Sequence, residues 1–164
     1  MRILHLDQNH EYLSSELEKL GFENHYDYKS SKDEILEKID DYVGIIIRSR
    51  IIIDDEIIKS ANKLKFIARI GAGLENIDIV SAKKNNIQVL SAGEANSNAV
   101  GEHAIGMLLN LLNKIGICNE EIKNNVWERE KNRGIELDKK VVGIIGFGKT
   151  GQSFAKKLSG FDCK

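Results

Sequence analysis

Short apolar runs alternate with amphipathic stretches through the first half of the chain. Candidate strands cover residues 3–6, 25–28, 43–47, 64–68 and 87–90, and helical patterns lie between them. The run 43–47 is continuous and, apart from Gly44, β-branched, which is typical of a strand buried on both faces. Ser31 with Glu34 forms a capping-box pattern, and Asp54 is placed to begin another helix. Strands alternating with helices predict a parallel sheet in an α/β domain, here flavodoxin-like.

Small and polar residues around 92–98 indicate a domain boundary, so we expect one domain over 1–95 and a second part over 96–164. A long helix is predicted over 98–117, begun by Ser97 or Asn98, with an apolar stripe that includes Met107 and Leu111. That stripe fits a core or a dimer surface equally well. A charged loop then leads to a predicted strand over 141–145.

Composition narrows the function classes. The net charge is -1 with both signs interspersed, which does not favour nucleic acid or anionic lipid as a partner. Two cysteines, Cys118 and Cys163, are too few for a disulfide framework or a zinc site. No apolar run approaches the roughly 20 residues that cross a bilayer, and the start of the chain has no signal-peptide layout. We therefore expect a cytoplasmic protein without a metal.

A glycine loop follows the predicted strand over 141–145. Gly146, Gly148 and Gly151 have GxGxxG spacing and open a helical pattern. In a dinucleotide site these glycines allow the tight turn, the close approach of the pyrophosphate and the packing of helix on strand. A plain strand-to-helix turn is the alternative. The acidic residue that would bind the ribose is expected beyond Lys164, so the choice between NAD and NADP stays open.

Several further segments occur in a recognisable order. They are residues 45–49 (IIIRS), 67–78 (IARIGAGLENID), 96–112 (NSNAVGEHAIGMLLNLL), 127–130 (WERE), 134–137 (GIEL) and 143–152 (GIIGFGKTGQ). Together they resemble the NAD-dependent D-2-hydroxyacid dehydrogenases, and among these the phosphoglycerate dehydrogenases. The resemblance covers nearly the whole chain. It implies a flavodoxin-like substrate domain, a linker helix and the start of a Rossmann domain that binds NAD.

The resemblance also implies roles for individual residues. Those implied to bind a small anionic 2-hydroxy or 2-keto acid are Arg48, Ser49, Arg69, Gly71, Ala72, Gly73 and Asn96. Those implied to bind the cofactor are Ala72, Gly146, Gly148, Lys149, Thr150 and Gly151. A homodimer formed through the region of the long helix is implied as well. The loop before Asn96 lacks the proline usual in the family.

Family chemistry uses a histidine, a glutamate and an arginine that come well after the glycine loop. We therefore expect no catalytic residue among these 164 and an inactive chain. His103 lies on the apolar side of the predicted long helix, where a packed side chain is expected.

The leading hypothesis is hydride transfer between NAD and 3-phosphoglycerate. Glyoxylate or hydroxypyruvate reduction is the near alternative, and a non-catalytic NAD-sensing regulator on the same fold is a third. A receiver domain is disfavoured because Arg48 follows the third predicted strand, where a phosphoacceptor aspartate would be needed.

Overall fold

Five short strands form one parallel sheet in the order β2-β1-β3-β4-β5. The strands are β1 (Arg2–His5), β2 (Glu23–Tyr26), β3 (Gly44–Ile47), β4 (Phe66–Arg69) and β5 (Gln88–Ser91). This order is that of flavodoxin-like domains, so the predicted α/β class is confirmed. The computed structural model describes all residues from 1 to 164. The chain divides into two units, Met1–Gly93 and Glu94–Lys164, and each is described by itself.

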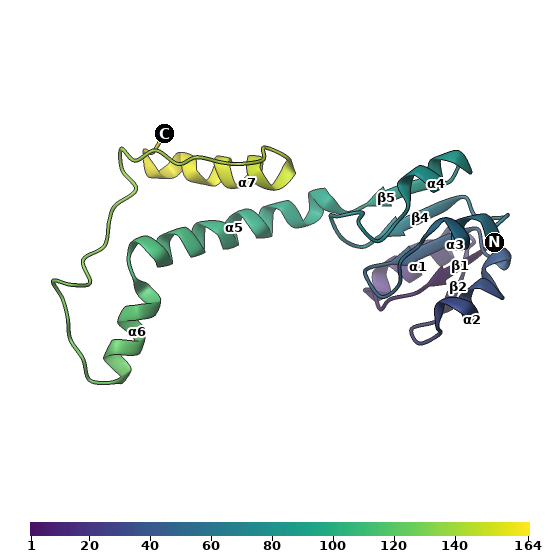
Figure 1. Cartoon of the computed structure of the whole chain (residues 1–164), viewed down its shortest axis with the longest axis horizontal. Helices are drawn as coiled ribbons and strands as arrows, with labels where there is room; N and C mark the ends of the chain where they lie inside the picture. The colour runs from purple at the N-terminus through teal and green to yellow at the C-terminus, as the bar shows by residue number, and fades with distance from the viewer. The chain divides into compact units, whose positions relative to one another are not determined.

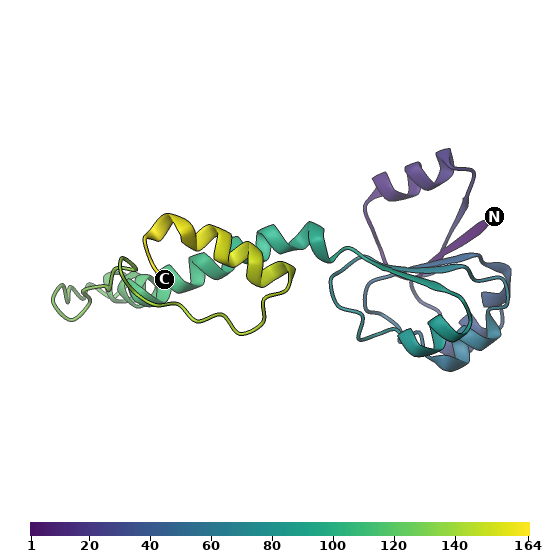
Figure 2. The same cartoon turned by 90° about the horizontal axis from the view of Figure 1, so that it is seen from above.

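Helices cover both faces of the sheet in the first unit. They are α1 (Glu11–Lys19), α2 (Lys32–Leu36), the short 3-10 helix η1 (Ile39–Asp41), α3 (Asp55–Ser60) and α4 (Ile79–Lys84). Helix α1 lies on one face, and α2, α3 and α4 lie on the other (Figure 2). This division follows from right-handed crossovers between parallel strands.

The main core lies between the sheet and the layer formed by α2, α3 and α4. Alternate residues of the central strands point into it, as the period of two along a strand requires. Its fully buried members include Leu6, Ile35, Ile45, Ile57 and Ile67. Burying one such side chain contributes roughly 1.5–3 kcal/mol, so this layer supplies most of the stability of the first unit.

Local sequence signals set the ends of these helices as predicted. Ser31 and Glu34 form the capping box of α2, with the Glu34 side chain bonded to the Ser31 N–H. The Asp54 carboxylate accepts from the Ile57 N–H at 3.2 Å and begins α3. Gly21, with φ of +84°, turns the chain after α1 into β2, in a region of φ that favours glycine.

The second unit is built from helices. They are α5 (Gly93–Leu112, whose first residue closes the first unit), α6 (Ile115–Lys123), α7 (Lys149–Leu158) and the 3-10 helix η2 (Ser159–Phe161) (Figure 1). None of the helices is both long and apolar enough to cross a bilayer. Buried apolar side chains are few in this unit, namely Leu137 and Leu158.

The predicted single helix over 98–117 is wrong at both ends. Helix α5 begins at Gly93, not at Ser97 or Asn98, because Glu94 and Ala95 favour a helix and no proline stops it. It ends at Leu112, and Lys114 has a left-handed φ of +53° before α6 begins. The Asn110 side chain accepts from the Gly116 N–H at 2.8 Å, which supports the break.

The predicted strand over 141–145 is also wrong. These residues belong to no sheet, and Ile145 is fully exposed. One backbone hydrogen bond involves them, from the Val142 N–H to the Lys164 carbonyl at 2.7 Å; the preceding Lys140 carbonyl accepts from the Lys164 N–H at 2.8 Å. A strand is defined by its neighbours, and an apolar run alone does not supply them.

Candidate functional site

Three loops meet at the carboxyl edge of the sheet in the first unit. Asp7 follows β1, Arg48 to Arg50 follow β3, and Arg69 ends β4 and leads into the loop that reaches Gly73. A hollow of about 330 Å³ opens there, lined by Leu6, Asp7, Gln8, Tyr28, Arg48, Ser49 and Arg50. In open parallel sheets ligands bind at this edge, so this is the first candidate site.

Arg48 and Arg50 have different surroundings although only Ser49 separates them. The Arg50 guanidinium donates to three main-chain carbonyls, those of Leu6 at 2.7 Å, Ser30 at 2.7 Å and Asp27 at 3.1 Å. The Arg48 guanidinium is exposed and makes no hydrogen bond or ion pair. Arg48 is therefore the cation that can meet an anionic ligand at this edge.

Arg69 is held by the loops around it. Its side chain is 13% exposed. Its guanidinium donates to the Arg48 carbonyl at 2.8 Å, to the Gly73 carbonyl, and to the Glu75 carboxylate at 3.1 Å. In this structure Arg69 therefore links the loop after β3 to the loop after β4, and its charge is offset by Glu75.

The loop after β4 presents unused backbone donors. The Gly71 N–H donates to the Arg69 carbonyl at 3.0 Å, and the Gly71 carbonyl accepts from Ala92 at 2.9 Å. The N–H groups of Ala72 and Gly73 have no acceptor within the protein, and Ala72 is exposed. Successive free N–H groups of this kind suit a carboxylate.

Burial and neighbouring groups shift the pKa values of two titratable side chains near this edge, Asp27 and Tyr28. Burial would raise the pKa of Asp27, but hydrogen bonds from Lys38, Ser30 and Lys29 bring it well below its usual range. Burial and the neighbouring Tyr26 raise the pKa of Tyr28, so its phenol stays neutral. Tyr28 can therefore donate or accept a hydrogen bond in the hollow, while Asp27 stays a fixed anion.

The glycine loop forms a second candidate site, within the second unit. Gly146 has φ of +89°, a conformation that favours glycine. A side chain at Gly151 would collide with the Gly146 carbonyl, whereas nothing lies within 4 Å of the corresponding position at Gly148. Gly148 begins α7 without a side-chain cap, so the first N–H groups of α7, including those of Lys149 and Thr150, are free. Such a helix start favours a phosphate.

Helix α7 packs along α5 in the same unit (Figures 1 and 2). Gly101 of α5 is buried at the contact, where an added methyl would lie 2.7 Å from the Ser153 Oγ. Lys149 pairs with Glu94 at 2.5 Å and lowers the pKa of that carboxyl. Lys157 donates to Asn98 at 2.6 Å. The glycine loop is thus anchored to α5 through its own helix.

Asn96, a further predicted binding residue, lies exposed on the first turns of α5. It belongs to the second unit, whereas Arg48, Ser49, Arg69 and the Gly71–Gly73 loop belong to the first. Within the first unit, the predicted substrate-binding residues gather at the carboxyl edge of the sheet. Within the second unit, the predicted cofactor-binding residues gather at the start of α7.

All four histidines are accounted for. His5 is buried, with Nε2 and Nδ1 within 2.8 Å of Asn24 and Asn9, and burial lowers its pKa. His10 caps α1 and His25 contacts Glu23 and Tyr42. His103 is exposed, so the expectation that it packs is wrong. His103 lies about 200° around the axis of α5 from Gly101, the residue that contacts α7, so its side chain faces solvent.

Two residues of this edge were missed from the sequence. Asp7 accepts three backbone N–H groups of the loop after β3, and Asn76 donates to the Ser49 carbonyl at 3.1 Å. An acidic residue directly after the first strand was a usable signal for Asp7. Nothing local marks Asn76, because its partner is distant in sequence.

Comparison with known proteins gives a consistent result. The sequence profile of the D-isomer specific 2-hydroxyacid dehydrogenase catalytic domain matches residues 3–157. D-3-phosphoglycerate dehydrogenase of Archaeoglobus fulgidus is 34% identical over 162 residues, which are 99% of this chain and 31% of that protein. Hydroxypyruvate reductase of Thermotoga maritima is 37% identical over 133 residues, 81% of this chain and 44% of that protein.

Solved structures show a similar fold. The PH0520 protein of Pyrococcus horikoshii has a TM-score of 0.88 at 30% identity, over 99% of this chain and 50% of that one. NAD⁺-bound 3-phosphoglycerate dehydrogenase of Entamoeba histolytica has a TM-score of 0.75 at 32% identity, over 100% of this chain and 52% of that one. The chain thus spans about a third to a half of the length of these proteins. It belongs to the D-isomer specific 2-hydroxyacid dehydrogenase family.

Proposed function

We propose that this chain is the N-terminal part of an NAD-dependent oxidoreductase that moves a hydride between a nicotinamide and C2 of a D-2-hydroxy acid. The preferred substrate is 3-phosphoglycerate, which is oxidised to 3-phosphohydroxypyruvate. One observation carries the proposal. The free N–H groups of Ala72 and Gly73 and the free guanidinium of Arg48 occur on two loops that Arg69 joins. A small acid with an anionic group at each end needs such a pair of anion sites.

The residues then have distinct tasks in binding. The backbone N–H groups of Ala72 and Gly73 hold the substrate carboxylate. Arg48, with the Ser49 hydroxyl and the neutral Tyr28 phenol, receives the second polar end in the hollow. Gly71 and Arg69 shape the two loops, and the family resemblance implies a further polar contact from Asn96. Fixing the acid at two points orients C2 and so lowers the entropic part of the barrier.

The glycine loop fits the cofactor that the family resemblance implies. The open space at Gly148 and the free N–H groups at the start of α7 suit a pyrophosphate, with Lys149 and Thr150 contributing backbone N–H groups. Gly146 and Gly151 keep the turn tight, and the family resemblance implies that the nicotinamide lies near the backbone at Ala72. Bound there, NAD would supply the hydride acceptor for C2, and the hydroxyl proton would pass to a base.

The family resemblance assigns that base to none of the 164 residues. His5 is buried in hydrogen bonds to amides, and the other histidines cap, pair or lie on α5. We therefore assign the histidine, glutamate and arginine of the reaction to the part of the relatives that this chain does not span. The chain by itself is expected to be inactive.

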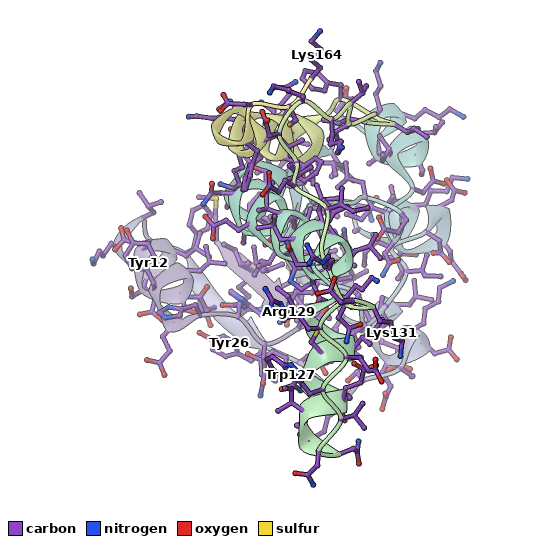
Figure 3. All side chains as sticks on the ribbon, turned by 90° about the vertical axis from the view of Figure 1, so that its left-hand side faces the viewer. Tyr12, Tyr26, Trp127, Arg129, Lys131 and Lys164 are labelled. Atoms are coloured by element: carbon purple, nitrogen blue, oxygen red, sulfur yellow. The ribbon has the colours of Figure 1, made fainter.

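A homodimer is the proposed assembly. Exposed apolar side chains gather on α5, α6 and the segment after them, namely Met107, Leu111, Ile115, Ile117, Ile122 and Trp127, the last labelled in Figure 3. Monomeric proteins rarely expose so many large apolar groups together. Sedimentation analysis tests the assembly, and Leu111→Glu should shift a dimer to monomer.

Hydroxypyruvate reduction is the second candidate, favoured by the 37% identity to the Thermotoga maritima hydroxypyruvate reductase. Both reactions use the same carboxylate site and differ at the far end of the substrate. The test compares 3-phosphoglycerate oxidation with hydroxypyruvate reduction in a version extended through the nucleotide-binding part of the relatives. A higher kcat/KM for the phosphorylated acid supports the first candidate, and cofactor binding without turnover of either acid would indicate a regulator.

A further inference from the structure

The turn after β3 has its peptide groups engaged on both sides. A single carboxylate oxygen of Asp7 accepts the N–H groups of Arg48 at 2.7 Å, Ser49 at 3.2 Å and Arg50 at 3.3 Å. On the carbonyl side, Arg69 donates to Arg48 at 2.8 Å and Asn76 donates to Ser49 at 3.1 Å. The protein itself therefore engages all three N–H groups of the turn and the carbonyls of Arg48 and Ser49.

These contacts decide which groups remain for a ligand. Three converging N–H groups would otherwise form an anion-binding concavity of their own, but Asp7 fills it. The Arg50 guanidinium is used by three carbonyls and holds the turn against the ends of β1 and β2. The groups of this turn that remain for an anionic ligand are the side chain of Arg48 and the hydroxyl of Ser49, both exposed at the hollow.

We infer that Asp7 is a positioning residue of the substrate site: it fixes the turn Arg48–Arg50 so that Arg48 and Ser49 are presented to an anionic substrate. Asp7 itself does not bind the acid, since a carboxylate would repel it. This inference rests on the proposed function and adds a residue to it. The bonds to Asp7 are charge-assisted, which makes them stronger than bonds to a neutral acceptor.

The test uses the 164-residue chain and nuclear magnetic resonance. Hydrogen exchange of the Arg48, Ser49 and Arg50 amides is measured first, without ligand. The chain is then titrated with 3-phosphoglycerate while the Arg48, Ser49, Ala72 and Gly73 amides are followed. Four proteins are compared: wild type, Asp7→Asn, Asp7→Glu and Asp33→Asn. Asp33 lies in the first turn of α2 and serves as the control for the lost charge.

We expect Asp7→Asn to speed exchange of the three turn amides about tenfold and to weaken binding about fivefold or more. Exchange of the β3 amides should not change, which separates a local effect from loss of the fold. Asp7→Glu should restore part of the affinity, and Asp33→Asn should behave as wild type.

Two results overturn the inference alone: turn amides that exchange as in wild type, or a loosened turn with unchanged affinity while wild type binds. A wild-type chain whose Arg48 and Ala72 amides do not respond to 3-phosphoglycerate overturns the proposed substrate site, and the inference with it. The two failures are therefore distinguishable.

Discussion

Gly101 and Gly106 lie in the same helix, α5, but in opposite surroundings. A methyl group added at Gly106 meets nothing within 4 Å. At Gly101 it would lie 2.7 Å from the Ser153 Oγ and 3.1 Å from the backbone nitrogen of Phe154, both on α7. Replacing each glycine with alanine therefore separates the helix preference of alanine from the packing of α7 on α5.

The two effects have known sizes. Alanine in place of glycine favours an exposed helix by about 1 kcal/mol, so Gly106→Ala should raise the free energy of unfolding. An extra methyl in a close contact costs typically about 1–3 kcal/mol. Although the Ser153 hydroxyl can rotate away, the backbone of α7 cannot. The free energy of unfolding of Gly101→Ala should lie about 1–3 kcal/mol below that of Gly106→Ala.

This difference is measured by urea titration, with circular dichroism and the fluorescence of Trp127, the single tryptophan, as the two signals of unfolding. Trp127 belongs to the second unit, so its signal reports the unit in which both glycines lie. Adding Ser153→Ala to Gly101→Ala should recover part of the loss by removing the 2.7 Å contact. If Gly101→Ala stabilises as much as Gly106→Ala, α7 does not pack on α5 at this point and the reasoning fails.

Three further predictions concern charge and capping. Burial lowers the pKa of His5, so unfolding takes up a proton as the pH falls below about 6.5. In urea titrations the wild type should therefore lose stability from pH 7 to pH 5, and His5→Gln should flatten that dependence. An equal pH dependence of the two proteins would show that His5 is not buried in its neutral form. Glu94 pairs with the Lys149 ammonium next to the glycine loop. Because Glu94→Gln frees that cation for the anionic cofactor, calorimetry should show NADH binding to the extended protein tightened by up to about fivefold. Weaker binding would mean that Glu94 supports the loop. Ser31 caps α2, so Ser31→Ala should cost roughly 0.5–2 kcal/mol of unfolding free energy, and no change in thermal unfolding would count against the capping box.

Local chemistry made much of the fold predictable. The β-branched run at 43–47 identified β3, and Ser31 with Glu34 and Asp54 identified the starts of α2 and α3. Each of these signals depends on residues only a few positions apart, so it can be recognised from the sequence alone. The GxGxxG spacing likewise predicted a turn at Gly146 and a helix after it.

Features that depend on distant partners were not predictable in the same way. The run 141–145 is apolar enough for a strand, but strand pairing is decided by neighbours elsewhere in the chain. Arg69 was expected to bind an anionic substrate, whereas the fold places the Arg48 and Gly73 carbonyls and the Glu75 carboxylate around its guanidinium. The helix break at Lys114 depends on a side chain bonding across it.

The most direct measurement is a calorimetric titration of NADH into the extended protein and into its Gly148→Val variant. Nothing lies within 4 Å of the position that a side chain at Gly148 would take, so the variant should fold normally. Its side chain would occupy the space assigned to the pyrophosphate. We expect the parent protein to bind NADH and oxidise 3-phosphoglycerate, and the folded variant to do neither. Equal NADH binding by both proteins would contradict a dinucleotide site at the glycine loop.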